Sequence, residues 1–378
     1  MRFLTAGESH GKALVVILEG FPKGVKINDS VINSELEKRM QGPGRGQRMQ
    51  IEKDKVEILS GLRNKISLGS PIAMVVKNKD AKINPQGKDS LEEKNIVRPA
   101  HADLAGALKY GEKDINNILE RASARETAAR VCVGSVCKQF LGLFEAKVAS
   151  YIKQIGNYQS SKNPKDINSI LKKTKNSMLK SIDKKDEQAM FQQINKAKEE
   201  KDSVGGVVEV WAGVVPVGLG SFMQFDQRLD AKLASYLMSI PAVKGVEIGA
   251  GFGYAGKKGS HSHDAIYYSK DKGYYHKTNN SGGIEGGVSN GEPIVIRIAM
   301  KPIATLTKPL DSVNLKTKKR QKASLIRSDT AAVVACSVVA ETMCAIAVTE
   351  SFLDKFGSDS LAQIRSNYKN YIKTIKNQ

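Results

Sequence analysis

Short apolar runs bounded by turn residues, with longer helical patterns between them, predict a chain of mixed strands and helices. The runs typical of strands cover residues 13–19, 56–60, 71–76, 205–217, 243–249 and 293–300. Helical patterns cover residues 30–40, 123–144 and 329–352. Glycines with a proline at residues 20–24 and 42–46 mark a turn and an irregular loop.

A polar, lysine-rich stretch at residues 160–202 also has a helical pattern. We interpret it as a peripheral insert in a single domain that spans residues 1–378.

The two long helical patterns begin alike. Thr127-Ala128-Ala129 and Thr330-Ala331-Ala332 each lead into a run of Val, Cys, Ala and Ser, with an arginine two or three residues before. An internal duplication, with two similar halves packed back to back, would explain this. Chance similarity between two Ala-rich buried helices would explain it equally well.

The apolar stretch at residues 330–352 is interrupted by Glu341 and Glu350, which favours a buried helix over a membrane span. The first residues lack the long apolar segment of a signal peptide. The four cysteines, Cys132, Cys137, Cys336 and Cys344, lie in apolar helical patterns and form no C-x-x-C pair. These features predict a cytoplasmic protein with reduced cysteines and no membrane partner.

A formal net charge of +20 is compatible with nucleic-acid binding, but the two basic residue types are distributed differently. Residues 153–201 hold 12 lysines, six acidic residues and no arginine, which is typical of a solvated surface and lacks interleaved aromatics. The chain has 14 arginines, and eight of them fall in four short segments: Arg39, Arg45 and Arg48; Arg98; Arg121, Arg125 and Arg130; and Arg327. Because guanidinium groups match phosphate and carboxylate geometry, the clusters indicate a small polyanionic ligand rather than nucleic acid.

The segment Glu120-Arg121-Ala122-Ser123-Ala124-Arg125-Glu126-Thr127 precedes an apolar helix. Ser123 and Glu126 have the spacing of a capping box, so Ser123 is the predicted N-cap. Arginines are unfavourable at the positive end of a helix, so Arg121 and Arg125 require a negative partner. Either an acidic side chain or a bound phosphate would supply it.

Two glycine-rich segments need separate interpretations. The loop at residues 42–46, followed by Arg48, can approach a ligand closely or be a plain surface loop, but it is no P-loop. The segment at residues 251–256 matches G-x-G-x-x-G, yet no helical pattern follows it, so we reject a dinucleotide-binding fingerprint.

His10 and His101 lie in loop settings rather than on apolar helical stripes, so either could act as an acid near neutral pH. The cluster His261-Ser262-His263-Asp264 resembles a metal site, but we expect an ordinary surface loop and no metal. Asp329 opens the last long helical pattern, where it is a helix cap or, beside Arg327, a base. The segment Lys301–Thr305 places an ammonium and a hydroxyl just after a predicted strand.

Taken together, these motifs resemble those of the chorismate synthase family over nearly the whole chain. The similar segments are Gly7-Glu8-Ser9-His10-Gly11 with Gly20-Phe21-Pro22, residues 98–103, 120–127, 239–245 and 301–305, and Arg327-Ser328-Asp329 running to Glu341. Ala100 stands where the family often has Gly.

The resemblance implies an α+β fold, the β-α-β sandwich of that family, assembled as a homotetramer. It also implies the last step of the shikimate pathway, in which 5-enolpyruvylshikimate 3-phosphate loses phosphate and its C6 hydrogen to give chorismate. The resemblance also implies that reduced FMN is required although the reaction has no net redox change. The flavin would be reduced with NADPH by the chain itself or by an external flavin reductase.

The resemblance further implies a role for each matching residue. His10 would protonate the departing phosphate, His101 would protonate or stabilise the reduced flavin, and Asp329 would assist removal of the C6 proton. The implied substrate ligands are Ser9, Arg48, Arg98, Arg125 and Arg327. The implied FMN contacts are Arg121, Ala122, Ser123, Pro241, Ala242, Gly287, Lys301, Pro302, Ile303, Ala304, Thr305 and Arg327. Arg39 and Arg45 match positions linked to NADP. A flavin reductase and a non-enzymatic nucleic-acid binder are the competing functions.

Overall fold

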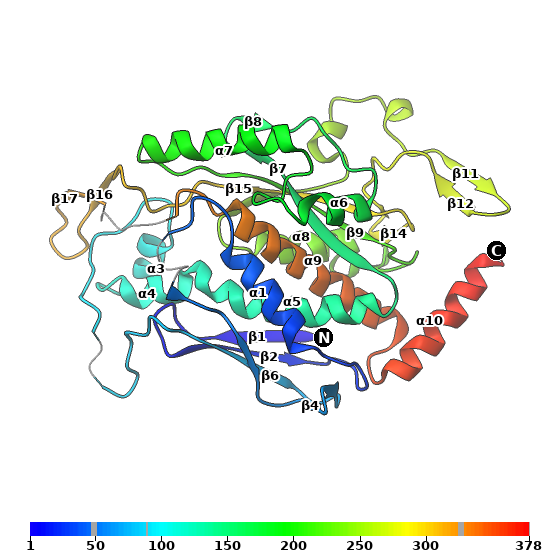
Figure 1. The fold of residues 1–378 in the computed structure, drawn as a ribbon, viewed down its shortest axis with the longest axis horizontal. Helices are drawn as coiled ribbons and strands as arrows, with labels where there is room; N and C mark the ends of the chain where they lie inside the picture. Colours follow the sequence, from blue (N-terminus) through cyan, green and yellow to red (C-terminus); the bar gives the residue numbers. More distant parts are fainter. Residues whose placement is uncertain (47–50, 88–89, 324–328, 378) are drawn as a thin grey trace.

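Two antiparallel sheets enclose a layer of helices in the computed structural model, which describes residues 1–46, 51–87, 90–323 and 329–377 (Figure 1). The smaller sheet has the order β1-β2-β6-β3 and consists of β1 (Arg2–Ala6), β2 (Ala13–Glu19), β3 (Val56–Ile58) and β6 (Ile72–Lys77). The larger sheet has the order β10-β15-β9-β7-β8 and consists of β7 (Lys147–Ile155), β8 (Tyr158–Gln159), β9 (Gly206–Gly213), β10 (Val243–Ile248) and β15 (Ile294–Met300). The predicted strands are confirmed to within a few residues at their ends.

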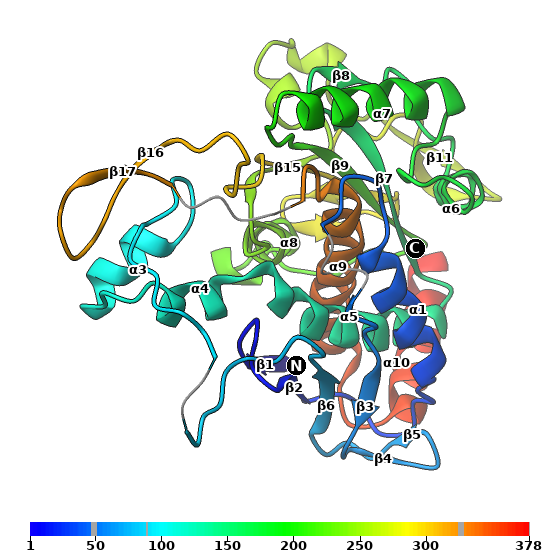
Figure 2. The same cartoon turned by 60° about the vertical axis from the view of Figure 1, so that its left-hand side comes forward.

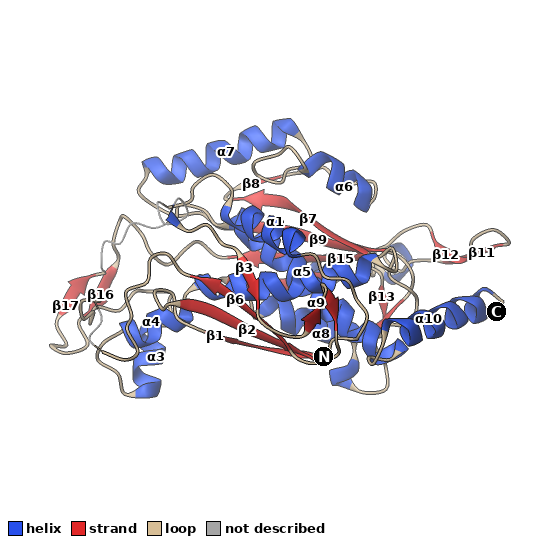
Figure 3. Cartoon of the chain, turned by 60° about the horizontal axis from the view of Figure 1, so that its bottom comes forward, coloured by secondary structure: helices blue, strands red, loops and turns tan. Residues whose placement is uncertain are grey.

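The helices between the sheets are α1 (Asp29–Met40), α5 (Thr127–Gly142), α8 (Leu229–Met238) and α9 (Val333–Phe356). Figure 3 shows this layered arrangement from another side. Helix α5 packs on β2 and β6, whereas α9 packs on β7 and β9. The predicted β-α-β sandwich is therefore confirmed.

The remaining elements lie around this body. Two helices, α3 (Asp103–Tyr110) and α4 (Asn116–Ala122), project at one end beside the hairpin of β16 (Asp311–Val313) and β17 (Arg320–Lys322) (Figure 2). Helix α10 (Leu361–Lys376) extends from the opposite end. Three small hairpins complete the fold: β4 (Leu62–Arg63) with β5 (Ile66–Ser67), β11 (Ile266–Ser269) with β12 (Gly273–His276), and β13 (Ile284–Glu285) with β14 (Val288–Ser289).

The two halves of the chain have the same connectivity, which supports the predicted internal duplication. The first half runs β1, β2, α1, β3, β6, α5, and the second runs β7, β9, α8, β10, β15, α9. Each half forms its sheet in the order first, second, fourth and third strand. Because each half contributes one sheet and two central helices, the halves pack back to back through α5 and α9.

The lysine-rich residues 160–202 contain α6 (Ile167–Thr174) and α7 (Lys184–Glu199), which lie on the outer side of the larger sheet (Figure 1). Ile170 and Met190 are fully buried there. The insert therefore covers the sheet face that α9 does not contact.

Helix α9 is buried on nearly all sides, as the apolar stretch predicted. Among the helices in the described residues, α9 alone is long and apolar enough to cross a membrane. However, 94% of its most apolar 18-residue stretch is buried inside the fold. The four cysteines are buried and unpaired, and burial raises the pKa of each thiol to about 12. They are packing residues, as predicted.

Close packing of α5 against α9 depends on Gly134. A Cβ atom at this position would lie 2.2 Å from Cβ and 2.5 Å from Cα of Thr342. We expect Gly134→Ala to lower the free energy of unfolding by about 1–3 kcal/mol, because the helices must move apart. Urea denaturation measures this change. Gly142→Ala in the same helix is the matched control, since a Cβ at Gly142 meets nothing within 4 Å. Equal stability of the two variants would contradict the prediction.

Candidate active site

Six chain connections meet at one end of the sandwich. Helices α5 and α9 run parallel, since Gly134 lies against Thr342 and the rings of Phe140 and Phe352 are 5.6 Å apart. Both helices therefore begin at the same end and direct their positive dipole ends there. The connections at this end are residues 7–12, 41–55 and 78–126 from the first half, and 156–205, 239–242 and 301–332 from the second.

Hydrogen bonds join these connections both within each half and across the two halves. Asn78 donates to the carbonyl oxygen of Gly11, and Thr330 donates its backbone N–H to Gly44. Lys301 donates its backbone N–H to Ala242 and its ammonium to the carbonyl oxygen of Ala100. Most of the predicted site residues lie on these connections, so the sandwich brings together side chains that are far apart in the sequence.

His10 lies on the tight connection between β1 and β2. Its Nδ1 is 2.8 Å from Oε1 of Glu120, and its backbone N–H donates to Oε2 of the same carboxylate at 2.7 Å. Ser9 is buried and donates its backbone N–H to the carbonyl oxygen of Glu120. Gly7 has a φ of +107°, and a Cβ there would meet the carbonyl oxygen of Ala13 at 2.3 Å. The loop thus needs glycine at this position to place the histidine.

His101 belongs to a second cluster with Arg98, Asp103 and Thr305. Asp103 lies 2.5 Å from Nδ1 of His101 and accepts from Nε of Arg98 at 2.8 Å. Arg98 also donates to the hydroxyl of Thr305 at 3.1 Å. Burial opposes ionisation of Asp103, but hydrogen bonds with His101 and Arg98 outweigh it and hold the pKa of this carboxyl well below its ordinary value. The cluster therefore joins residues predicted to contact substrate and flavin.

Ala100, next to His101, has a φ of +60°. This is the left-handed region that glycine adopts most easily, so a glycine would suit this backbone position.

Arg125 and Arg39 are buried around one carboxylate. Arg125 donates to Oδ2 of Asp54 at 2.6 Å and to Asn78 at 2.9 Å. Arg39 donates to Thr127 and to the carbonyl oxygen of Ala124, with its Nη1 3.6 Å from Asp54. Burial lowers the pKa of Arg39 to about 10. The sequence left open whether an acidic side chain or a bound phosphate is the partner of Arg125, and in the structure Arg125 pairs with the acidic side chain of Asp54.

The predicted capping box is wrong. Ser123 accepts from the backbone N–H of Arg125 and caps a short 3-10 turn, Ala124–Glu126, between α4 and α5. The Glu126 carboxylate instead accepts from Thr5 and Arg130. Ser123 therefore keeps a capping function, whereas the tertiary contact with Thr5 takes Glu126 out of the capping box.

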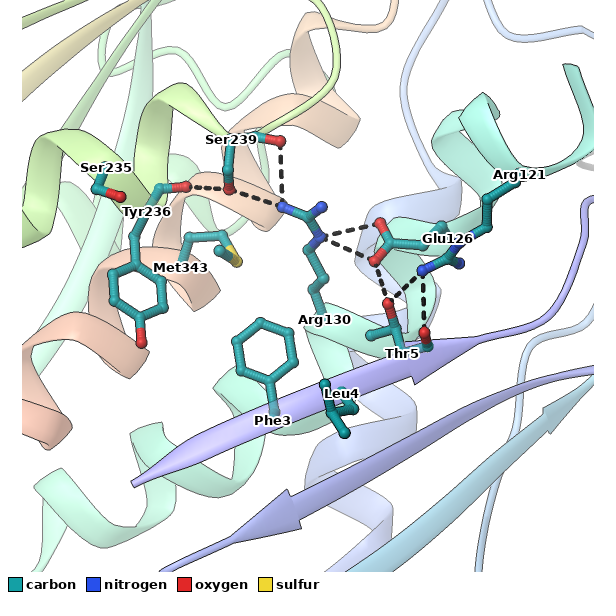
Figure 4. A pocket seen from close by; sticks show the side chains of 10 residues that line it. All are labelled: Phe3, Leu4, Thr5, Arg121, Glu126, Arg130, Ser235, Tyr236, Ser239 and Met343. Carbon is teal, nitrogen blue, oxygen red and sulfur yellow. Dashed lines mark hydrogen bonds and ion pairs between the residues drawn. The ribbon is translucent and has the colours of Figure 1, made fainter. Parts of the chain in front are cut away.

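A pocket of about 410 Å³ opens between β1, α8 and α9 (Figure 4). Arg130 crosses it from Glu126 to Ser239, and Arg121 donates to the backbone and hydroxyl oxygens of Thr5. Arg121 thus lines this pocket, whereas neither histidine does.

Asp329 is not a helix cap, and α9 begins four residues later than predicted, at Val333. Asp329 accepts from the backbone N–H of Gly46 at 2.5 Å and lies 2.8 Å from Arg45. Burial lowers the pKa of Arg45, and Asp329 opposes this shift. The loop at residues 42–46 binds the backbone of Thr330 as well, so tertiary contacts hold the segment before α9 in a non-helical conformation.

The predicted flavin residues are only partly brought together. Pro241, Ala242 and Lys301–Thr305 lie on adjoining connections, and Ala122 and Ser123 lie at the end of α4. Burial and the nearby Lys244 lower the pKa of Lys301. Gly287 is at the other end of α8, where its carbonyl oxygen accepts from Leu229. The length of that helix separates it from Ala242 by roughly 15 Å.

Two predicted substrate ligands, Arg48 and Arg327, lie outside the described residues. Asp264 accepts from Thr278, Asn280 and Ser281, which gives it a structural function in its loop. In the described part of the chain, no group of three or more His, Cys, Asp or Glu side chains could hold a metal ion. Residues 251–254 form a 3-10 turn, in keeping with rejection of the dinucleotide fingerprint.

Sequence reasoning overlooked the carboxylates that hold these cations and histidines: Glu120, Asp103 and Asp54. Asp103 belongs to the motif at residues 98–103 and Glu120 to the motif at residues 120–127, so both acids could have been selected from the sequence. No sequence signal pointed to Asp54. Its partner Arg125 is 71 residues away in the sequence, and its other partner, Arg39, lies on the far side of a loop. The assembled site combines buried arginines with two partly exposed histidines, groups whose chemistry suits an anionic ligand.

Comparisons with known proteins identify the same family that the sequence motifs resemble. Residues 1–353 match the family model described as chorismate synthase. A chorismate synthase from Alkaliphilus metalliredigens is 52% identical over 377 residues, covering 98% of this chain and 99% of the relative. One from Sulfurihydrogenibium sp. is 51% identical over 390 residues, covering all of both chains. A crystal structure of chorismate synthase superposes with a TM-score of 0.82 at 40% identity, covering 100% of this chain and 98% of the other.

Proposed function

The chain belongs to the chorismate synthase family, whose members are lyases of the last shikimate-pathway step, and we propose that its active site is the end of the sandwich where α5 and α9 begin. In this step 5-enolpyruvylshikimate 3-phosphate loses phosphate and its C6 hydrogen to give chorismate. The observation that carries the proposal is the meeting of two carboxylate-held histidines with buried arginines on these connections.

The substrate carries one phosphate and two carboxylates, so its site must offer several charge-assisted donors. We assign Ser9, Arg98 and Arg125 to these anions, together with Arg48 and Arg327, which lie outside the described residues. Nη2 of Arg125 and Nη1 of Arg39 are buried and donate no hydrogen bond, although each lies 3.6 Å from a carboxylate oxygen, of Glu52 and of Asp54 respectively. Such donors suit an anion, because each charge-assisted hydrogen bond contributes about 1.5–3 kcal/mol.

We assign His10 as the acid that protonates the departing phosphate, because its ring is held in place and its side chain stays 22% exposed. His101 is 20% exposed and would donate to the flavin. Asp329, with 22% of its side chain exposed, would assist removal of the C6 proton. In each case the protein holds the group in place before the ligand arrives.

The donors on residues 121–123, 241–242 and 301–305 fit FMN. The fit rests on cationic Arg121 and Lys301, the hydroxyls of Ser123 and Thr305, and the backbone around Ala242, which has a φ of +73°. Gly287 is assigned to the same cofactor by resemblance alone. When bound, reduced FMN would donate electron density to the substrate transiently, so that the reaction has no net redox change.

For NADPH we propose Arg45 and Arg39. Arg45 is the nearer to solvent, whereas Arg39 is 4% exposed and contributes mainly positive potential. Oxidation of NADPH by the chain with FMN under anaerobic conditions would support this site. No oxidation would favour an external flavin reductase.

The function is tested by phosphate release. We expect the purified chain, given substrate and prereduced FMN without oxygen, to release phosphate and form chorismate in equal amounts while the flavin stays reduced. A flavin reductase would instead consume NADPH in proportion to product. A reaction with oxidised FMN is the control. A folded chain that releases no phosphate would contradict the assignment.

We also propose a homotetramer in the cytoplasm. Exposed apolar side chains lie on the outer face of the smaller sheet, including Leu4, and on the β11–β12 hairpin, including Tyr268 and Tyr274. Patches of this kind are typical of subunit interfaces. Four buried unpaired cysteines suit a reducing compartment. Sedimentation velocity would measure the mass of the assembly.

A further inference from the structure

Glu120 holds His10 at two points, the main chain and the ring. One carboxylate oxygen accepts the backbone N–H of His10 at 2.7 Å, and the other lies 2.8 Å from Nδ1. Because an ionised carboxylate can only accept hydrogen bonds, Nδ1 must carry a proton. We infer that Glu120 is a positioning residue that fixes the tautomer and orientation of His10, so that Nε2 is the nitrogen that faces the substrate.

The surroundings of Glu120 make this contact strong. Its side chain is 5% exposed, and it occupies the last turn of α4, which also binds Ser9 through the carbonyl oxygen of Glu120. Away from water, a hydrogen bond between a carboxylate and an imidazole is stronger than on the surface. The carbonyl oxygen of His10 accepts from Lys82 and Ile83, which fixes the loop from its other side.

Asp80 is the other carboxylate near this ring. Its Oδ2 lies 3.5 Å from Nε2, beyond the usual length of a hydrogen bond, and it pairs with Lys82 at 3.2 Å. Within the described residues, Nε2 therefore has no hydrogen-bond partner. This arrangement suits a histidine that gives its Nε2 proton to an incoming phosphate.

The inference rests on the proposed role of His10 and adds a consequence for Glu120→Gln. The amide has nearly the same shape, and its oxygen can still accept the backbone N–H of His10. Its NH₂ group would then donate to Nδ1, which reverses the neutral tautomer.

The tautomer can be measured in the full chain by ¹⁵N NMR with labelled histidine at a pH where the ring is neutral. Five histidines give few signals, and His10→Asn identifies those of His10. We expect the proton on Nδ1 in the unmodified chain and on Nε2 in Glu120→Gln. A proton on Nε2 in the unmodified chain would overturn the inference, whether or not the variant folds.

Kinetics provide the second measurement. We expect Glu120→Gln to lower kcat by about 10²–10³-fold, with KM changed by less than about threefold, because general acid catalysis contributes on this scale. Glu112→Gln, a carboxylate just before α4 that accepts from Asn117, is the matched control and should retain normal turnover.

A double variant distinguishes this inference from the proposed role of His10. Glu120→Gln should not slow His10→Ala further, since residues that act as a unit are not additive. A further slowing by the full factor would show that Glu120 acts elsewhere and would overturn the inference. Normal turnover of His10→Ala would refute the role of His10, while the NMR result for Glu120 would stand.

Discussion

Replacing His10 with alanine should lower turnover by about 10²–10⁴-fold while FMN binds almost as well as before. The ring contacts Glu120 and lies near Asp80, and its backbone binds residues 82 and 83. None of these contacts involves the residues that we assign to FMN. The loss should therefore fall on protonation of the departing phosphate rather than on cofactor binding.

Phosphate release in a single turnover with prereduced FMN measures the chemical step, and flavin fluorescence measures binding. His263→Ala is the matched control, because His263 is exposed on a loop outside the proposed site. Weak FMN binding by His10→Ala would show that His10 belongs to the flavin site. Turnover within about threefold of normal would show that it is not the acid.

Replacing Glu341 with alanine should destabilise the fold by about 3–5 kcal/mol, which is the usual loss when one partner of a buried ion pair is removed. Glu341 is buried in α9 between Lys138 of α5 and Lys180 of the insert, and it accepts from Ser150 of β7. Without the carboxylate, Lys180 would lose its acidic partner, and Lys138 would keep only Glu35. Urea denaturation measures the loss.

Lowering the pH should reduce the difference in free energy of unfolding between the unmodified chain and Glu341→Ala. Burial opposes ionisation of Glu341, but the two lysines outweigh it and hold the pKa below its ordinary value of 4.5. A depressed carboxyl pKa stabilises the fold fully above the unfolded value, and this contribution is lost as pH falls through the folded value. Glu200→Ala, which removes an exposed pair with Lys196 at 4.0 Å, is the control and should change stability by less than about 1 kcal/mol. Similar losses in both variants would contradict the prediction.

The regular elements of the fold could be predicted from the sequence because their signals are local. The strand Ala13–Glu19 alternates buried and exposed positions along its own length, and its bounds were predicted without error. The buried helix after residue 330 was evident from its small apolar residues and two isolated acids. The start of α9 was not, since contacts of Gly44 and Gly46 from the other half fix the segment around Asp329.

The candidate site shows the same division. Its arginines and histidines could be selected from the sequence because they lie in dense motifs with few alternatives. Their pairing could not, since Thr305 is 207 residues from Arg98 in the sequence and Asp54 is 71 residues from Arg125. The contact of Lys180 with Glu341 could not be predicted either. The sequence of a lysine-rich segment does not distinguish a lysine that forms a buried ion pair from its solvated neighbours.

The equivalent connections of the two halves have become very different. In the first half, the link between the first two strands is the short loop that carries His10, and in the second half the same link is the insert with α6 and α7. Two identical halves would surround a ligand with a pocket of two-fold symmetry, which could not distinguish one side of a ring from the other. A substrate with its phosphate on one side and its reacting hydrogen on another needs a pocket without that symmetry. Joining both halves in one chain allowed each copy of a loop to change alone, so the duplicated frame could acquire an interior without two-fold symmetry.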